Sequence, residues 1–568
     1  MMLEQKNEGL IGYIVGGSLK ENLQVRLTVL PQMVQEGSFV VIESGHWQFY
    51  GLVTDLQLGA TDPRFADEQS EARLPSELAK LLHGQTLYTN LVVLPALMLE
   101  SEPQPDSPEY NAWREKYAEH EPTILPIKTV PSHHSPVLLA HAGHVAAIFG
   151  KPEKEGNFVI GYTREQGHPV CINLERVVQR SAGIFGATGT GKSFLTRILL
   201  AGLIHNAKAS VLVFDMHNEY GFDDTASDTG ERVTGLRMAF PQKVRVVALG
   251  RTASIRGQAP DFHLEIAEKD IQPEDIEMLT RELNLKETTP ATLEALITTF
   301  GRENWFHAFK NMNQAQIENE EGKKVPHPDS VAAWANRAGV SVMAAEALHS
   351  KLGRVFHKPY IVEQTAADSL GEIVKALDAG QHVVLSFGEH ESDLDYLLVT
   401  NLLTRKLRQI WEQRTNEYRS HGRQEPRQLV IVVEEAHKLL NREVAAQTTF
   451  STIAREMRKY YVTLLIVDQR PSQIDDEVMS QLGTRISGWL GDDADIQAVL
   501  SGLANREALR GMLARLQPKE EVLLLGWGVP MPIPVRSRRY DQRFWEELGV
   551  RAGVRRKTEQ ILGELGFG

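Results

Sequence analysis

Apolar and polar positions alternate along the first sixty residues, in short segments that glycines separate. The segments are LIGYIVGG, LQVRLTVL, GSFVVIES and WQFYGLVTDLQLG. Alternation with a period of two is typical of strands that bury one face. Short strands at such close spacing predict a small β-barrel at the start of the chain.

A different pattern begins near residue 166, where continuous apolar runs alternate with segments of helical spacing. The apolar runs are SAGIFG, ASVLVFD, HVVLSF, QLVIVVEE and VTLLIVDQ. Strands that are buried on both faces and alternate with helices form βαβ units, which build a parallel sheet covered by helices. We therefore expect an α/β fold in this part of the chain.

A long interruption separates the second apolar run from the third. Residues 255–365 include DIEMLTRELNL and ATLEALITTFG, whose apolar residues recur at helical spacing, so they predict a helical insertion. Residues 98–122 are acidic and contain prolines, which indicates either an exposed excursion from the barrel or a linker. The predicted order is a barrel (1–165), an α/β core in two parts (166–254 and 366–545), the insertion between them (255–365) and a C-terminal tail (546–568).

Composition limits the class of protein. A chain of 568 residues with 42% hydrophobic content is large enough for more than one core. The N-terminal segment lacks the features of a secretion signal, and no apolar run approaches the ~20 residues of a membrane helix. We expect a soluble, cytoplasmic protein with no membrane partner. The single cysteine, Cys171, is expected to be a packed apolar residue rather than a nucleophile or a metal ligand. The net charge of −13 is only weak evidence against nucleic-acid binding, because it does not show where the 61 Lys and Arg lie.

GATGTGKS, residues 186–193, matches the pattern GxxxxGK[ST]. It follows the apolar run GIF and precedes the helical FLTRILLAGLI, which is the context that a P-loop requires. In a P-loop, backbone N–H groups surround the phosphates, the lysine reaches the β/γ oxygens and the hydroxyl binds Mg²⁺. The predicted nucleotide-binding residues are Gly186, Ala187, Thr188, Gly189, Thr190, Gly191, Lys192 and Ser193.

LVIVVEEAHKLL predicts the second half of an ATPase site. Glu434 and Glu435 follow five apolar residues at the carboxyl end of a strand, where ligands bind in open α/β sheets. One acid can hold Mg²⁺, directly or through water, while the other positions or deprotonates the attacking water. Without the P-loop, paired glutamates would more often be a solvated helix start. Two adjacent acids favour hydrolysis, and the lack of an NKxD-type motif favours ATP.

Further polar residues surround the last apolar run. Gln469 follows VTLLIVD, where a sensor of the γ-phosphate would lie. Arg455 and Arg458, in IAREMRKYYV, either complement a helix dipole or enter a neighbouring subunit's nucleotide site, and we favour the second role. Arg180, just before the P-loop strand, is a weaker candidate for a similar contact.

VFDMHNEYG places Asp215, His217 and Glu219 directly after the strand that follows the P-loop helix. These residues could be a solvated turn, but the strand order puts them at the same sheet edge as the ATP site. We expect subunit-interface or phosphate-facing contacts from them. Four histidines near the barrel lack a completing acid or cysteine, so we predict no metal site at His133, His134, His141 and His144.

With GATGTGKS, VFDMHNEY, EEAH and IAREMRKYYVTLLIVDQRPSQID in order, the chain resembles the HerA family of hexameric ATPases, within the group that includes FtsK-type DNA pumps. The resemblance covers most of the length and implies an N-terminal barrel, a RecA-like core and a helical insertion. It implies that Glu434 binds metal, Glu435 is the catalytic glutamate, Gln469 is a sensor and Arg458 acts in trans, with Arg455 as the runner-up.

The resemblance also implies partners. It points to a ring, expected to be a hexamer, that threads double-stranded DNA with ATP and Mg²⁺. A nuclease of the NurA type, in DNA end processing, or another effector in phage defence would act beside it. Alternatives are a protein-translocating motor and an ATP-gated assembly platform for a defence effector. The locally basic stretch 535–557 is either a solvated tail or a subunit- or DNA-facing segment.

Three residues depart from the family pattern. Glu434 stands where Asp is usual, Met457 replaces a usual glycine in RExRK, and Asn218 replaces a usual glycine in DxHxEY. None of these changes removes a catalytic group, although the longer arm of Glu434 puts direct metal contact in question.

Overall fold

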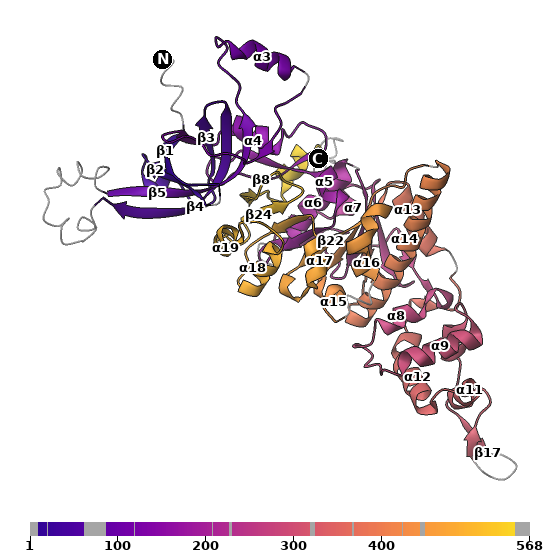
Figure 1. Ribbon diagram of the computed structural model, residues 1–568. Coiled ribbons are helices and arrows are strands. Elements are labelled where there is room, and N and C mark those ends of the chain that lie inside the picture. Colours follow the sequence, from indigo (N-terminus) through magenta and orange to yellow (C-terminus); the bar gives the residue numbers. More distant parts are fainter. Residues whose placement is uncertain are drawn as a thin grey trace, which may run out of the picture. The chain divides into compact units, whose positions relative to one another are not determined.

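The computed structural model describes residues 9–19, 21–61, 87–118, 120–206, 208–225, 230–318, 324–365, 368–422, 424–443 and 449–550 (Figure 1). The chain forms two compact units. The first comprises Met1–Val177, Phe185–Lys192 and Gly483–Arg538, and the second comprises Val178–Ile184, Ser193–Leu482 and Arg539–Gly568. The predicted tail, 546–568, lies outside the described residues beyond residue 550.

The first unit contains a closed antiparallel β-barrel. Its strands pair in the order β2-β1-β7-β3-β4-β5, and β5 pairs back with β2. The expectation of an N-terminal barrel is therefore confirmed. The strands are β1 (Leu10–Gly16), β2 (Leu23–Leu27), β3 (Phe39–Ser44), β4 (Trp47–Ala60), β5 (Leu87–Glu100) and β7 (Pro136–Leu139), and the short β6 (Leu125–Pro126) pairs with β5 outside the ring.

Alternation along β3 shows how the barrel is packed. Val40 and Ile42 belong to the barrel core and are fully buried. Phe39 packs instead against Phe149 of α4 (Ala142–Phe149), with ring centroids 5.6 Å apart. The predicted excursion at 98–122 contains α3 (Glu109–Lys116), which has no buried residue.

A run of five strands, antiparallel from β23 to β9, also belongs to the first unit. Its strands pair in the order β23-β24-β25-β8-β9 and come from distant parts of the chain. They are β8 (Asn157–Tyr162), β9 (Pro169–Asn173), β23 (Thr484–Ser487), β24 (Glu521–Gly526) and β25 (Ile533–Ser537).

The second unit is built on a largely parallel sheet, which confirms the α/β expectation. Its order is β15-β14-β20-β11-β21-β22-β10, with parallel pairing from β15 to β22. The strands are β10 (Ala182–Phe185), β11 (Ser210–Asp215), β14 (Val244–Leu249), β15 (Phe262–Leu264), β20 (His382–Ser386), β21 (Leu429–Glu434) and β22 (Val462–Asp468). All residues of β11, β20, β21 and β22 are buried, which explains their uninterrupted apolar runs.

Helices with defined ends pack on this sheet. α6 (Lys192–Asn206) follows the P-loop, and α16 (Thr449–Glu456) precedes β22. The long α14 (Asp393–His421) begins at Ser392, whose hydroxyl accepts the N–H of Asp395, and ends at the left-handed Gly422. A polar N-cap and a C-terminal glycine fix the two ends of a helix in this way. In the described part of the chain, no helix combines the length and apolar character needed to cross a bilayer.

The predicted helical insertion is present in the second unit. It contains α8 (Pro273–Glu277), α9 (Thr289–Phe300), α10 (Trp305–Lys310), α11 (Val331–Ala338), α12 (Val342–Phe356) and the hairpin β17 (Gln316–Glu318) with β18 (Lys324–Pro326). Figure 1 shows α9, α11, α12 and β17 grouped together. Buried aromatic residues form its core, namely Trp305, Phe306, Phe309, Trp334 and Phe356.

Candidate nucleotide-binding and catalytic site

The P-loop, residues 186–193, has the backbone geometry that its glycines allow. Gly189 (φ 75°) and Gly191 (φ 92°) lie in the left-handed region, which L side chains rarely adopt. A Cβ atom on Gly186 would lie 2.6 Å from Oγ1 of Thr190. That hydroxyl donates to the carbonyl of Ala187 at 2.7 Å, which closes the turn.

Lys192 folds back over this loop. Its ammonium donates to the carbonyls of Gly186 (2.9 Å) and Ala187 (3.2 Å). Bonds from a cation to phosphate oxygens are stronger than bonds to neutral carbonyls, so a nucleotide can compete for this ammonium. The helix α6 begins at Lys192, and its first-turn N–H groups and dipole favour an anion. Ser193 lies half-buried in that first turn.

Carboxylates end three neighbouring strands of the second unit. Asp215 ends β11, Glu434 ends β21 and Asp468 ends β22, and these strands pair in parallel. All three side chains are buried. The predicted meeting of the strand ends at one sheet edge is therefore present.

Asp215 organises the turn that follows β11. Its carboxylate accepts the N–H groups of Glu219 (2.7 Å) and Tyr220 (2.9 Å). Burial raises the pKa of Asp215 to about 6, against the lowering effect of these two bonds. His217 is exposed and Glu219 is half-buried.

Asn218 shows why its position tolerates the change from glycine. Its φ is 56°, in the left-handed region that Asn adopts more readily than most residues. Its Oδ1 accepts the N–H of Gly388 at 3.1 Å and contacts the hydroxyl of Ser386. The side chain thus ties the turn to the end of β20 and the loop after it.

Two tyrosine hydroxyls hold Glu434. Tyr220 donates to Oε1 of Glu434 at 2.5 Å, and Tyr396 of α14 donates to the backbone carbonyl of Glu434 at 2.8 Å. The other carboxylate oxygen, Oε2, is buried and has no hydrogen-bond partner among the described residues. Burial raises the pKa of Glu434 well above its usual range, and burial beside Glu434 raises the pKa of Tyr220.

The backbone turns sharply at Glu435, directly after β21. Its φ is 45°, which is uncommon for a residue with a side chain and is found at functional sites. The amide of Gln469 donates to both carboxylate oxygens of Glu435, each at 3.1 Å. The structure therefore brings together the residues predicted as catalytic glutamate and sensor.

A His–Asp pair supports this arrangement and was not predicted. Asp468 accepts the N–H and Nδ1 of His437 through Oδ2 (2.7 and 3.0 Å) and the N–H of Arg470 through Oδ1 (2.7 Å). The bond to Asp468 raises the pKa of His437. These contacts join the turns on which Glu435 and Gln469 lie. His437 lies in EEAH and Asp468 in VDQR. Their contact could not be predicted from the sequence, because it depends on the pairing of β21 with β22.

Two of the predicted arginines, Arg458 and Arg180, lie at the other edge of the sheet, where the strands begin. Arg458 is exposed in the 3-10 turn Met457–Tyr460, just before β22 begins. Arg455 of α16 pairs with Glu477 at 3.2 Å. Arg180 precedes β10. Met457 is buried without a positive φ, so glycine is not required at that position.

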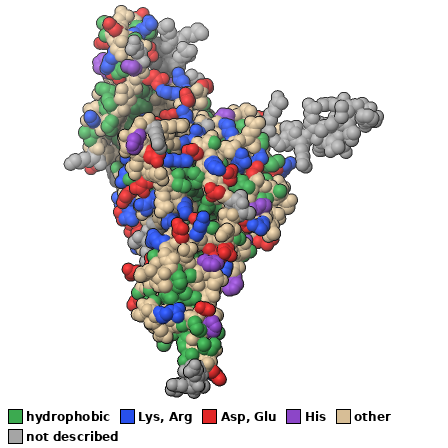
Figure 2. All heavy atoms as spheres, turned by 90° about the vertical axis from the view of Figure 1, so that its right-hand side faces the viewer, with side chains coloured by type: hydrophobic (Ala, Val, Ile, Leu, Met, Phe, Trp, Pro, Cys, Tyr) green, Lys and Arg blue, Asp and Glu red, His purple; other side chains and the backbone are tan. Residues whose placement is uncertain are grey.

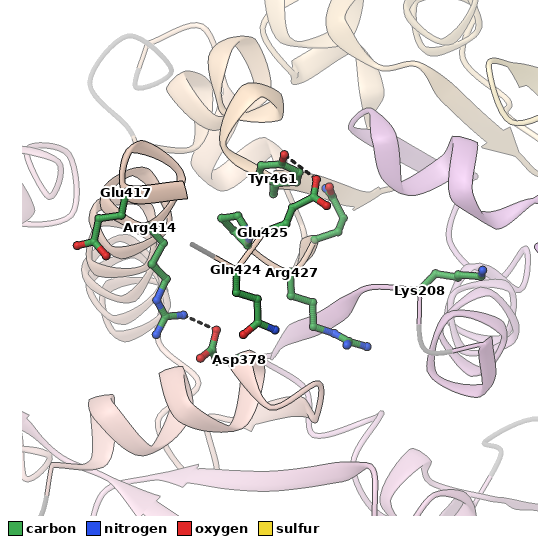
Figure 3. A pocket seen from close by; sticks show the side chains of 10 residues that line it. Lys208, Asp378, Arg414, Glu417, Gln424, Glu425, Arg427 and Tyr461 are labelled. Carbon is green, nitrogen blue, oxygen red and sulfur yellow. Dashed lines mark hydrogen bonds and ion pairs between the residues drawn. The ribbon is translucent and has the colours of Figure 1, made fainter. Parts of the chain in front are cut away.

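A hollow of about 640 Å³ also lies at the amino edge, beside the residues that precede β11, β21 and β22 (Figure 3). Figure 3 shows Arg414 bonded to Asp378 (2.6 Å) and Tyr461 bonded to Glu425 (2.8 Å). Its lining combines cations with carboxylates, and it lies at the opposite end of the strands from Glu434.

A P-loop, a buried strand that ends in two acids, and a parallel sheet covered by helices define a P-loop ATPase with a RecA-like core. A family model described as "Helicase HerA, central domain" matches residues 158–407. The "DNA double-strand break repair helicase HerA" of Sulfurisphaera tokodaii is 24% identical over 94% of each chain, and that of Sulfolobus acidocaldarius is 24% identical over the same shares. The chain is therefore similar to HerA proteins, over residues 158–407 for the family model and over 94% of its length for these two relatives.

Solved structures of related architecture are more distant. The bacterial conjugative coupling protein TrwB has a TM-score of 0.43 and 11% identity, over 71% of this chain and 93% of that one. VirB4 of Thermoanaerobacter pseudethanolicus has a TM-score of 0.41 and 13% identity, over 69% of this chain and 99% of that one.

Proposed function

We propose that this protein is a motor that uses ATP hydrolysis to move double-stranded DNA through a ring of its own subunits, expected to be a hexamer. One observation carries the hydrolytic part: of two adjacent glutamates, one is buried with an oxygen that no described residue bonds, and the other is held by Gln469. DNA as the substrate is supported by the HerA relatives, which match over 94% of both chains and are named as DNA double-strand break repair helicases.

The proposed roles follow the chemistry of each side chain. Lys192 and the backbone of 186–191 bind the phosphates. Glu435 orients the attacking water, and Gln469 keeps the Glu435 carboxylate in place and responds to the γ-phosphate. Asp215 and Glu219 shape the turn that carries Tyr220.

Mg²⁺ fits the oxygen donors that this edge provides. Mg²⁺ prefers oxygen ligands and keeps several waters, so it needs only one or two protein groups. Oε2 of Glu434 is buried and unpartnered among the described residues, which suits a ligand that acts directly or through water. The Ser193 hydroxyl would be the second group. The bound ion would neutralise charge on the phosphates during their transfer.

Arg458 is proposed to act on a neighbouring subunit's nucleotide. β22 spans seven residues, and Arg458 and Gln469 flank its two ends. At about 3.3 Å per residue they are roughly 20 Å apart along the strand, too far for Arg458 to reach the catalytic edge of its own chain. A ring brings each subunit's arginine to the next site, where it would stabilise transition-state charge.

The proposed partner is a nuclease, of the NurA type or another kind, or a defence effector, so the pathway is DNA end processing or phage defence. DNA would be held by a limited number of Lys and Arg side chains that contact its phosphates.

Figure 2 shows Lys and Arg intermixed with Asp and Glu on the face that it draws, in keeping with the net charge of −13.

The test is ATP hydrolysis by the purified protein with and without double-stranded DNA. We expect DNA to stimulate hydrolysis, and Lys192→Ala and Glu435→Gln to abolish it. Lys192→Ala should also lose nucleotide binding, whereas Glu435→Gln should retain it. Hydrolysis that does not respond to any double-stranded DNA, linear or circular, would contradict a DNA motor.

A further inference from the structure

The two carboxylate oxygens of Glu434 have unequal surroundings. Oε1 accepts the Tyr220 hydroxyl at 2.5 Å, whereas Oε2 has no partner in the described part of the chain. Both side chains are buried, so water does not compete for the bonded oxygen. A carboxylate bonded through one oxygen has a fixed plane, and its free oxygen has a fixed direction.

Tyr220 is itself fixed by several contacts. Its backbone N–H donates to Asp215 at 2.9 Å, and its ring lies 5.6 Å from the guanidinium carbon of Arg197. Arg197 also donates to the carbonyl of Glu219 at 2.7 Å. The phenol therefore enters from the turn after β11 at one defined position.

From this geometry we infer that Tyr220 is a positioning residue, which holds Glu434 so that Oε2 serves Mg²⁺ and its waters in the nucleotide complex. The inference rests on the proposed Mg²⁺–ATP site and adds a residue to it. Tyr220 does not contact the nucleotide or the metal; it acts through Glu434.

The long side chain of Glu434 leaves its carboxylate free to rotate unless a partner fixes it. A glutamate has one more rotatable bond than the aspartate that is usual at this position, so its carboxylate can adopt more orientations. The Tyr220 hydroxyl removes that freedom before the metal binds. An aspartate in the same backbone position would be one methylene short of the hydroxyl.

The experiment measures nucleotide affinity instead of turnover. A fluorescent, non-hydrolysable ATP analogue is titrated in Mg²⁺ and in EDTA. The dissociation constant in EDTA divided by that in Mg²⁺ reports the metal-dependent part of binding. We expect Tyr220→Phe to reduce this ratio roughly tenfold, as expected for the loss of one hydrogen bond to a carboxylate. The dissociation constant in EDTA should not change.

Tyr360→Phe is the matched control. Tyr360 is also fully buried and donates to a carboxylate, Oδ1 of Asp395, at 2.5 Å, but it does not contact Glu434. This variant should keep the wild-type ratio. An unchanged ratio in Tyr220→Phe, or an equal loss in Tyr360→Phe, would overturn the inference while leaving the proposed ATPase intact.

A second arm uses the length argument. In a Glu434→Asp background, Tyr220→Phe should change the ratio less than about twofold, because the shorter carboxylate no longer meets the hydroxyl. An equal effect in both backgrounds would show that Tyr220 acts through something other than Glu434. If the wild-type protein binds the analogue equally in Mg²⁺ and EDTA, both the metal role proposed above and this inference are wrong.

Discussion

Asp215 is buried because the turn after β11 depends on its carboxylate. Its two carboxylate oxygens accept the backbone N–H groups of Glu219 and Tyr220. Without Asp215, these two N–H groups would lose their acceptor. The residue therefore has a structural task in addition to its place at the catalytic edge.

Asp215→Ala is expected to destabilise the protein, because it leaves the buried N–H of Tyr220 and the partly buried N–H of Glu219 without an acceptor. The cost should be about 1–3 kcal/mol or more for the unsatisfied groups. Glu219→Ala is the matched control, since only the backbone of Glu219 takes part in the hydrogen bonds of this turn, and it should cost less than about 0.5 kcal/mol. Urea unfolding followed by tryptophan fluorescence measures both. Equal costs would contradict the assigned role.

Gln469 offers a second prediction at this scale. Its amide is the donor that the Glu435 carboxylate accepts through both oxygens. Gln469→Ala should lower the rate of ATP hydrolysis about 10²-fold while nucleotide affinity stays within twofold of wild type, because orientation of the water is lost and phosphate binding is kept. Single-turnover hydrolysis and nucleotide titration separate the two quantities. A loss of affinity equal to the loss of rate would mean that Gln469 binds nucleotide directly.

The sequence was informative about which residues end the strands and less so about their partners. Asp215, Glu434 and Gln469 follow apolar runs, so their position at one sheet edge could be predicted. The Tyr220–Glu434 bond could not, because it joins residues that are far apart in the chain and depends on the pairing of β11 with β21. The Tyr396 contact depends in the same way on how α14 packs.

At the scale of elements, the helical insertion is joined to the core through a buried ion pair. Asp275 of α8 accepts from Asn401 (2.9 Å) and from Arg405 (2.7 and 3.0 Å), both on α14. Asp275 is completely buried, and Arg405 also donates to the carbonyl of Asp270 at 2.9 Å. These contacts attach the helical insertion to α14, the long helix that also carries Tyr396.

Asp275→Ala is expected to loosen the insertion, because it leaves the Arg405 charge without its carboxylate. Breaking a buried pair by removing one partner costs about 3–5 kcal/mol. The neighbouring Glu274 pairs with Arg302 at the exposed surface, so Glu274→Ala should cost less than about 1 kcal/mol. Hydrogen exchange of α8–α10 and urea unfolding provide the measurement. If the hydrogen-exchange protection of α8 is unchanged in Asp275→Ala, Asp275 does not hold the insertion to α14.

Element prediction succeeded where a segment carries its own pattern. The five apolar runs became β10, β11, β20, β21 and β22, and ATLEALITTF lies in α9, whereas DIEMLTRELNL is helical only as far as Glu277 and continues as turns. The strand run β23-β24-β25-β8-β9 could not be predicted, since its strands are short and its β25–β8 pairing joins residues more than three hundred positions apart. β14 was missed although VRVVAL is an apolar segment, because it lies close before the long interruption.

For the whole molecule, the amino-edge position of Arg458 predicts complementation between two inactive variants. Glu435→Gln lacks the carboxylate that we propose to be catalytic but keeps Arg458, whereas Arg458→Ala keeps Glu435 but lacks the arginine. In a mixed ring, an intact Glu435 would meet an intact Arg458 at some subunit boundaries, so co-expressed variants should recover DNA-stimulated ATP hydrolysis that each lacks alone. A mixture of Lys192→Ala with Glu435→Gln is the control, because both lesions fall in the site formed by one chain together with its neighbour's arginine. In that mixture, each site takes both Lys192 and Glu435 from a single chain. A Lys192→Ala chain lacks the lysine and a Glu435→Gln chain lacks the carboxylate, so activity should stay absent. Arg458 acting within its own chain would leave the first mixture as inactive as the second, and that result would exclude the proposed trans role.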